Sequence, residues 1–340
     1  MKMRRAIFLF LAGVLLAGSA GRLCAIEDPA TESAFLAGES GYIGGNLLDY
    51  QFHDAPGSSG PSPAMTDDRE MGRFIVSKSE TDTWSVNERL GLFHVSPLGP
   101  IPGTTDTMPE NLWSVNAGGA YAHRLEGGKS WGLNFGIGSD SDNLFNSIHE
   151  TTFRAGANYR LPSGAHNAWL FSLNYSNNRH FFNGIPLPGV GYYFEALDRK
   201  LQGLVGFPFL ALRYRPTEDW TGRIALFGPR NFNAEVSRRL IGRIHAYTAF
   251  LWGSQEWELA NRQDTSNRLF FDRKRIALGV RSPLPYGLAL DVSGGREFDR
   301  RFFENDSSSY KDVPTIGLAP AWYAETRISW RFGAPPADKF

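Results

Sequence analysis

The sequence predicts an all-β fold, a single antiparallel transmembrane β-barrel of about twelve strands. Three observations predict it: apolar and polar residues alternate over many short stretches, aromatic residues stand near the ends of those stretches, and turn residues separate them. Aromatics make up 14% of the 340 residues, and 37 residues are glycine. This pairing is typical of many strands with bulky side chains joined by tight turns.

The first 25 residues are expected to be a secretory signal peptide. They begin with a basic stretch (MKMRR), continue through an apolar run and end in small residues. That order is the one a secretory signal has, and we expect cleavage after Ala20 or Ala25. Cleavage after Ala25 also removes Cys24, the only cysteine, and so excludes a thiolate nucleophile from the mature chain.

Residues 26–72 are expected to form a flexible N-terminal arm. The stretch FHDAPGSSGPSPAMTDDREMG within it is rich in Pro, Gly, Ser and Asp and shows little periodicity. The formal net charge of the whole chain is zero, and several of its basic residues lie in the signal segment. The mature chain is therefore not basic enough to bind nucleic acid as a partner.

Residues 73–332 are expected to form the barrel. In SWGLNFGIG (130–138), Trp, Leu, Phe and Ile alternate with Ser, Gly and Asn. A period of two, repeated along the chain, indicates strands with one apolar and one polar face. The candidate strands are 84–96, 112–125, 130–138, 149–161, 167–178, 204–214, 220–228, 232–239, 243–253, 274–282, 286–296 and 321–332.

The connections between these strands alternate in length. Short turns such as EGGK (126–129) contrast with longer polar connections at 258–268 and 304–313. This predicts hairpins whose short turns share one end of the barrel. The stretch 183–209 is broken by glycine and proline but is too apolar for an ordinary surface loop. We expect it to form either a constriction folded into the lumen or a cap over one end.

The position of the aromatic residues favours a membrane barrel over a soluble β-sandwich. Trp169 and Tyr175 stand at the two ends of one apolar face, six positions or about 20 Å apart. That separation approaches the apolar band of roughly 25 Å that membrane barrels present between two aromatic girdles. A sandwich would instead bury its aromatics between two sheets, and it stays open as a secreted soluble binding protein.

The last strand carries a resemblance to a known class. AWYAETRISWRF, Ala321–Phe332, alternates and closes on Phe332, and it resembles the C-terminal strand of bacterial outer-membrane β-barrel proteins of the porin-like class. The resemblance implies an outer-membrane location, contact with outer-membrane lipid, and recognition of this strand by the barrel assembly machinery. The sequence departs from the class in a tail, Gly333–Phe340, whose prolines cannot continue a ladder.

No motif for metal or cofactor chemistry is present, since HExxH, CxxC and GxSxG are all missing from the sequence. We therefore predict no metal site and no cofactor. Ser147, His149 and Glu150 are a candidate catalytic group at the rim, but the pattern favours polar residues at a strand–loop junction. The basic runs 238–239 and 273–275 are interpreted as marks of the membrane rim.

The predicted function is a porin-like passive channel or transporter of small polar solutes, which selects by lumen width and lining charge. Two membrane alternatives stay open: a closed structural barrel with Glu and Arg paired across a filled lumen, and an outer-membrane enzyme acting on lipid or peptide at the rim. The candidate lumen-lining residues are Glu150, Arg154, Asn158, Arg160, Glu325, Arg327 and Arg331.

Overall fold

The computed structural model describes residues 46–57, 63–101, 103–104, 106–179, 182–228, 231–262, 264–307 and 309–332. The predicted signal peptide, most of the predicted arm and the tail after Phe332 lie outside these ranges. Within them, no helix is long and apolar enough to cross a membrane.

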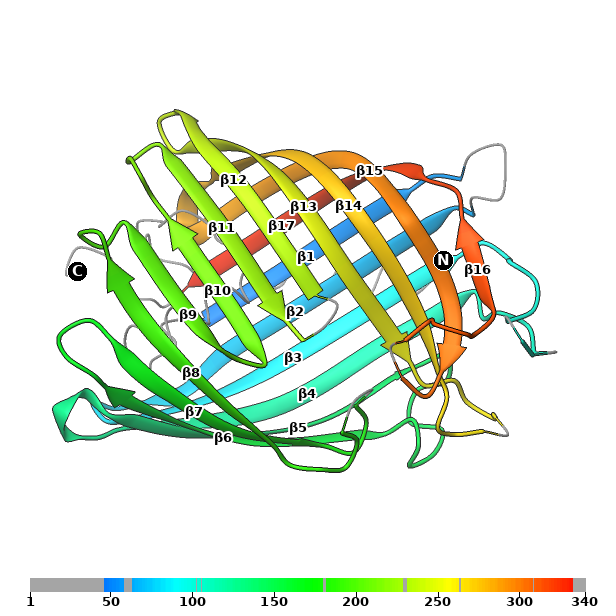
Figure 1. Cartoon of the computed structure of the whole chain (residues 1–340), viewed down its shortest axis with the longest axis horizontal. Helices are drawn as coiled ribbons and strands as arrows, with labels where there is room; N and C mark the ends of the chain where they lie inside the picture. Colours follow the sequence, from blue (N-terminus) through cyan, green and yellow to red (C-terminus); the bar gives the residue numbers. More distant parts are fainter. Residues whose placement is uncertain are drawn as a thin grey trace.

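Seventeen strands in the described part of the chain form one antiparallel sheet, and sixteen of them close into a ring (Figure 1). The ring closes because β1 pairs with both β2 and β17, while β16 pairs only with β15. The strands are β1 (Asn46–Ala55), β2 (Met65–Lys78), β3 (Asp82–Val95), β4 (Asn111–Arg124), β5 (Ser130–Ser141), β6 (Thr152–Pro162), β7 (Ala168–Ser176), β8 (Leu187–Ala196), β9 (Leu201–Phe207), β10 (Phe209–Tyr214), β11 (Trp220–Phe227), β12 (Asn231–Ile241), β13 (Ile244–Trp257), β14 (Arg268–Pro283), β15 (Leu288–Asn305), β16 (Thr315–Leu318) and β17 (Ala321–Phe332).

The all-β barrel is thus confirmed, but the predicted number of about twelve strands is wrong. One candidate strand, 204–214, is divided between β9 and β10, which pair as a hairpin. The stretch 183–209, left open as a constriction or a cap, supplies β8 and β9 instead. Its prolines and glycines fall within or between short strands, where they hide the period of two.

The predicted boundary between arm and barrel at residue 73 also needs correction. β1 and the first half of β2 belong to the ring, although both lie within the range predicted as an arm. The sequence MTDDREMGRF hides its strand character because charged residues occupy both faces: Asp67 points inward and is buried, while Glu70 is on the opposite face. Alternation of apolar with polar residues is therefore lost in the segment that closes the barrel.

The two ends of the barrel differ in their connections. Short turns such as 79–81 and 242–243 lie at one end, together with Asn46 and Phe332, which face each other across the β1–β17 pair. The longer connections, including 96–110 and 258–267, gather at the other end, on the right in Figure 1. We name these the short-turn end and the long-loop end; in outer-membrane barrels they face the periplasm and the exterior, respectively.

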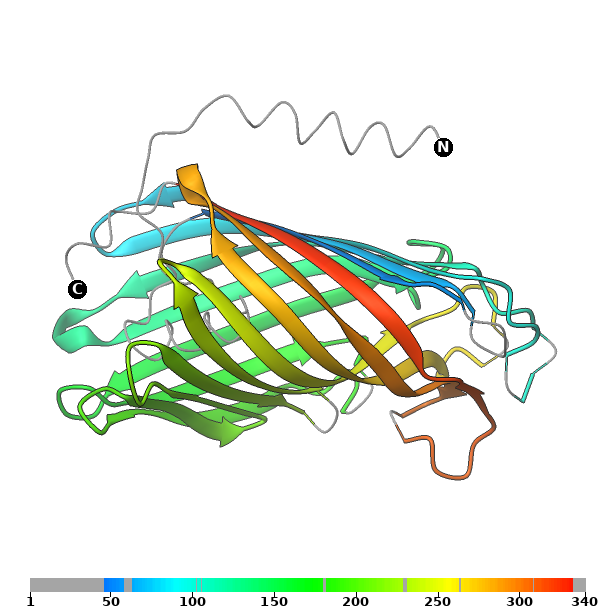
Figure 2. The same cartoon turned by 90° about the horizontal axis from the view of Figure 1, so that it is seen from above.

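The barrel wall has unequal height. β13, β14 and β15 contain 14, 16 and 18 residues, whereas β9, β10 and β11 contain 7, 6 and 8. At about 3.3 Å per residue the difference exceeds 20 Å of strand length. The low wall leaves the long-loop end open on one side. In the ring only β12 separates the low wall from the tall strands β13 to β15, which run in yellow to orange in the view from above in Figure 2.

The outer face is apolar with aromatic ends, as expected for a surface against lipid. In β17, Trp322 and Ile328 are exposed, while Tyr323 and Ser329 point inward and are buried. The aromatic face of AWYAETRISWRF therefore points away from the lumen, as predicted, and its charged face points inward.

Carboxyl groups on β2 and β3 interrupt this apolar surface. Glu70 and Glu88 lie on the outer face of β2 and β3, and Glu88 is in register with Ala117 of β4. Ala117 is midway between the outward aromatics Trp113 and Tyr121, so Glu88 sits near the middle of the apolar band. Among the described residues, neither Glu70 nor Glu88 makes an ion pair.

Candidate functional site: the barrel lumen

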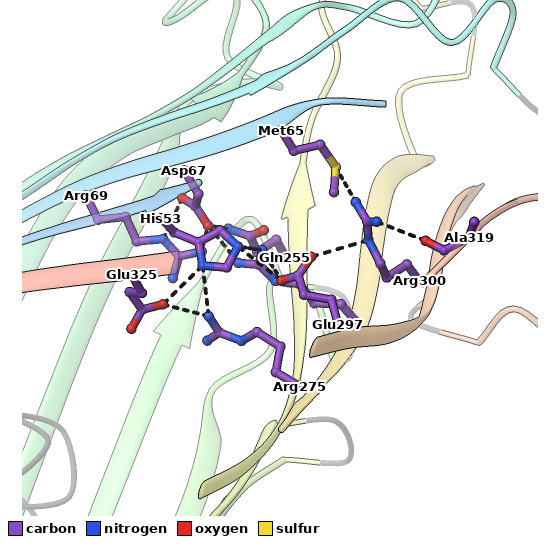
Figure 3. Close-up of polar contacts among 11 residues, drawn as sticks. His53, Met65, Asp67, Arg69, Gln255, Arg275, Glu297, Arg300, Ala319 and Glu325 are labelled. Atoms are coloured by element: carbon purple, nitrogen blue, oxygen red, sulfur yellow. Dashed lines mark hydrogen bonds and ion pairs between the residues drawn. The ribbon is translucent and has the colours of Figure 1, made fainter. Parts of the chain in front are cut away.

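The middle of the lumen contains a cluster of buried charges on five neighbouring strands, shown in Figure 3. Arg273 donates hydrogen bonds to Asp67 at 2.8 Å and to Glu297 at 3.0 Å. We name six of these residues the central ion-pair cluster: His53 (β1), Asp67 (β2), Arg273 and Arg275 (β14), Glu297 (β15) and Glu325 (β17).

A histidine occupies the centre of this cluster. The Nε2 atom of His53 lies 3.1 Å from Glu297, and its Nδ1 atom lies 3.2 Å from Glu325. Arg275 donates to the same Glu325 carboxylate at 2.7 Å. The side chains of His53 and Glu297 are fully buried. Since an unpaired buried charge is costly, this group holds the first, second and last strands of the ring in one arrangement.

A second set of charges lies nearer the short-turn end. Arg281 pairs with Asp291 at 2.8 Å and with Glu235 at 3.2 Å, and Arg223 reaches the same Glu235 at 2.8 Å. On β17, Arg327 donates to Asp49 of β1 at 2.8 Å. Opposite charges therefore alternate along this side of the lumen wall, where they satisfy one another.

The long-loop end is covered by apolar side chains. Phe93 lies at the centre of this group, with ring centroids 5.3 Å from those of both Trp257 and Phe271. We name it the long-loop core: Met65, Phe93, Val95, Ile101, Met108, Leu112, Trp257, Leu259, Leu269, Phe271, Phe302 and Leu318. It combines strand ends with loop residues, so the loops at this end are packed onto the barrel.

One segment of the tall wall reaches the opposite side of the ring. The pairing of β13 with β12 ends at Trp252, and we name the part beyond it, residues 253–262, the crossing segment. The backbone N–H of Glu258 donates to the carbonyl oxygen of Asp140 at 2.8 Å, and that of Ala260 donates to the carboxylate of Asp142 at 2.8 Å. These bonds fasten the crossing segment to the end of β5 and the loop after it.

Glu258 is the charged anchor of the crossing segment. Arg268 donates to its carboxylate at 2.8 Å, and the Asn178 amide donates to the same carboxylate. Burial raises the pKa of Glu258 above its usual range, and the bonds from Arg268 and Asn178 only partly oppose this. The docked crossing segment therefore favours the protonated form of this side chain.

A cavity of about 430 Å³ lies in the lumen, and residues 254–257 of the crossing segment form part of its wall. It borders the central ion-pair cluster through Asp67 and the long-loop core through Phe93, Leu112 and Trp257. Its rim includes Phe227 at the tip of the low β11–β12 hairpin. Its volume falls within the range of small-molecule sites. The cavity and the low wall together make this half of the lumen the candidate site.

The lining residues predicted from the sequence do not form one site. Arg154 borders the cavity and contacts Asp140 at 3.5 Å. Asn158 and Arg160 follow on the same face of β6 toward the short-turn end, where Arg160 donates to the carbonyl oxygen of Gly128 at 2.7 Å.

The three predicted residues of β17 lie on another part of the wall. Glu325 belongs to the central ion-pair cluster, Arg327 pairs with Asp49, and Arg331 lies on the same face near the short-turn end. Glu150 is not on a strand: it is buried in the β5–β6 connection and accepts a hydrogen bond from Ser147. The role of these seven residues in a solute path stays a prediction.

Sequence reasoning missed most of the charges that organise the lumen. His53 and Asp67 were hidden in the predicted arm. Arg273 and Arg275 were assigned to the membrane rim, but they point into the lumen, and only Lys274 between them points outward. Strict alternation through this run was the signal that separates the two arginines from the lysine.

Two groups of polar side chains at the ends of the barrel contain a histidine beside a carboxylate or a hydroxyl. The Ser147 hydroxyl donates to Glu150 and accepts from the backbone of His149, so the described contacts do not join Ser147 to the His149 ring. At the short-turn end, Asp82 lies 2.8 Å from His123 and also accepts from Tyr121. This group sits on the outer aromatic surface, where such residues anchor a barrel at a lipid–water boundary.

Within the residues that the structure describes, no group of three His, Asp or Glu side chains is placed to hold a metal ion.

Comparisons with known proteins give similarities to solved structures at low scores. No family model matches the chain, and no curated protein matches it. Among solved structures, an outer-membrane channel from Pseudomonas putida F1 is 11% identical with a TM-score of 0.36, covering 90% of this chain and 100% of that one. The Pseudomonas putida toluene transporter TodX is 10% identical with a TM-score of 0.37, covering 93% and 96%. LpxR from Salmonella typhimurium is 8% identical with a TM-score of 0.31, covering 84% and 100%.

Scores and identities this low carry no conclusion about activity. The chain itself has the architecture of bacterial outer-membrane β-barrel proteins: a closed antiparallel ring with an even number of strands, an apolar aromatic-ended exterior and a charged lumen.

Proposed function

We propose that the protein is a channel of the bacterial outer membrane that admits small polar solutes through a narrow, internally charged lumen. The observation that carries the proposal is the cavity of about 430 Å³ beside the low wall. A purely structural barrel of this kind would fill its interior with packed side chains or paired charges. Here that filling covers only part of the interior.

Selection in this channel works by width and by charge. The central ion-pair cluster and the charges around Arg281 narrow the lumen on one side, and Arg154 with its neighbours sets the electrostatic field of the cavity. A solute must exchange its hydration shell for these groups and then leave them again, which favours small and weakly bound solutes.

The outer-membrane location belongs to the same proposal. It is supported by the apolar outer surface and by the strand Ala321–Phe332, which has its aromatic residues on the outer face. We infer that outer-membrane lipid covers this surface and that the barrel assembly machinery recognises this strand.

Single-channel recording tests the function. The mature chain is refolded in detergent, checked for heat-modifiable migration on gels and added to a planar lipid bilayer. Discrete, reproducible current steps are expected. Inserted protein without current would favour the closed structural barrel. The crossing segment, which is docked across the lumen, is compatible with that alternative. Protein that stays soluble without detergent would overturn the membrane assignment.

A further inference from the structure

Three arginine side chains border the lumen cavity: Arg69 on β2, Arg89 on β3 and Arg154 on β6. Each has a carboxylate partner within reach, since Arg69 pairs with Asp67 at 2.6 Å while Arg89 and Arg154 share Asp140 at 3.1 and 3.5 Å. One carboxylate thus serves two guanidinium groups. The spacing places Arg89 and Arg154 on either side of Asp140.

The arginines and their partners differ in how far they reach into open space. The side chains of Arg69, Arg89 and Arg154 are 39%, 47% and 44% exposed, whereas those of Asp67 and Asp140 are 3% and 17% exposed. A solute entering the cavity therefore meets guanidinium N–H groups before it meets carboxylate oxygens. The guanidinium groups are therefore accessible hydrogen-bond donors of the cavity, and the partly exposed carboxylate of Glu256 lies in the same lining.

Each guanidinium group beside Asp140 also has N–H donors that its contact with that carboxylate does not use. The group presents five N–H donors in a planar fork, and Arg89 and Arg154 each contact Asp140 through one terminal nitrogen, Nη2. The other edge of each fork is oriented away from that bond. A carboxylate that enters between them can accept hydrogen bonds from both, in the arrangement that Arg–carboxylate pairs favour.

The rest of the cavity lining is mixed: the polar residues Ser114, Asn231, Ser254 and Gln255 stand beside apolar and aromatic ones. Trp257 and Phe270 are buried in its wall, and Phe227 is exposed at its rim. The exposed ring of Phe227 gives the cavity an apolar contact for a short hydrocarbon or a single aromatic ring. The site therefore combines an anion-recognising side with an apolar side.

The balance of charge limits the anion to a single negative charge. The six charged residues of the lining sum to zero: Asp67, Arg69, Arg89, Asp140, Arg154 and Glu256. A multiply charged phosphate would meet repulsion from Asp67, Asp140 and Glu256, whose summed charge equals that of the three arginines in magnitude. A monocarboxylate needs only the accessible donors of Arg89 and Arg154.

We propose that this cavity is a binding site for small organic monocarboxylates, with the carboxylate between Arg89 and Arg154 and the apolar part against Phe227 and Trp257. The inference rests on the proposed channel function and names its solute class. Asp140 competes with the ligand for the same two arginines, so it sets the affinity low enough for the solute to leave.

Calorimetric titration of the refolded protein in detergent tests the site without requiring current. Benzoate is the probe, benzamide its uncharged match and inorganic phosphate the multiply charged comparison. Benzoate is expected to bind at least tenfold more tightly than either of them. Equal binding of benzoate and benzamide would overturn the proposal, and this comparison uses the unaltered protein only.

Variants then locate the site. Arg89→Gln and Arg154→Gln are each expected to weaken benzoate binding at least tenfold, while Arg160→Gln, on the same face of β6 but outside the cavity, leaves it unchanged. Asp140→Asn is expected to strengthen binding severalfold because it releases both arginines. A merely structural role for Asp140 predicts the opposite, so weaker binding by this variant would also overturn the assignment.

Current and binding can fail separately. Benzoate binding without single-channel current keeps the site and rejects the channel. Current steps without benzoate binding keep the channel and reject the site.

Discussion

The backbone N–H of Glu258 donates a 2.8 Å hydrogen bond to the carbonyl oxygen of Asp140, joining two walls that lie half the ring apart. In an ordinary barrel, main-chain bonds run only between neighbouring strands. This bond exists because β13 continues beyond the end of its β12 pairing and leans inward. The crossing segment is therefore attached at its far side by few bonds, and its docking is open to test.

Removing the Asp142 carboxylate is expected to loosen the crossing segment. Asp142→Ala deletes the acceptor for the Ala260 N–H. A lost hydrogen bond to a charged group costs about 1–2 kcal/mol, which raises the undocked population roughly five- to thirtyfold. Longer or larger current steps in a planar bilayer are the expected readout. Asp264→Ala is the control, because among the described residues Asp264 accepts hydrogen bonds only from Ser266 of its own loop. Unchanged current would show that this anchor does not govern the path.

Docking of the crossing segment should depend on pH through Glu258. Its pKa is raised in the docked state from the ordinary value of 4.5. The stabilisation linked to proton binding is therefore fully present below about pH 4.5 and is lost as the pH rises through the raised pKa. We expect lower channel activity at pH 5 than at pH 7.5. Glu258→Gln should reduce the difference in channel activity between pH 5 and pH 7.5. If the variant kept the full difference, a group other than Glu258 would be its cause.

Arg273 should be the most sensitive position of the central ion-pair cluster. Arg273→Met leaves Asp67 and Glu297 buried without their shared partner. Breaking a buried ion pair by removing one member costs about 3–5 kcal/mol. Urea unfolding of the refolded barrel, followed by tryptophan fluorescence, measures the change. Lys274→Met is the matched control. The Lys274 side chain follows Arg273 in the sequence but points outward, where it forms a partly exposed ion pair with Asp299. Equal effects of the two variants would contradict the assigned role.

The outward carboxyl group of Glu88 is expected to destabilise the barrel in a bilayer. It lies near the middle of the apolar band, where a charged side chain on the lipid face is unfavourable. Glu88→Leu should raise the free energy of unfolding by about 1 kcal/mol in lipid vesicles. Glu80→Leu, in the exposed turn after β2, tests whether any added leucine has this effect. Destabilisation by Glu88→Leu would indicate that this carboxyl has a partner in the membrane.

The sequence was most informative where one face meets a uniform solvent. Trp322 and Ile328 are exposed on the outer face, where a lipid-facing strand has an apolar side chain at every second position. This pattern can be recognised within a single strand. Arg154 could be assigned to the inner face for the same reason. Its neighbour Asp140 could not be paired with it, since the bond depends on the register between β5 and β6.

The interior followed no such local rule. The contact between His53 and Glu325 joins residues separated by 272 positions, so no window of sequence contains both. Asp67 and Glu70 lie on opposite faces of β2, and charge on both faces removed the alternation that would have identified the strand. The crossing segment was unpredictable in another way, because its direction depends on the unequal lengths of β12 and β13.

The seam between β1 and β17 also constrains the order in which the molecule can be made. β1 finds its second partner only when the last strand has been synthesised, so the ring cannot close while the chain is still growing. Until then His53, Asp67 and Glu297 face water and stay hydrated. Only the complete ring buries these side chains. A chain truncated before β17 would lack both this burial and the hydrogen-bonded ladder between β1 and β17.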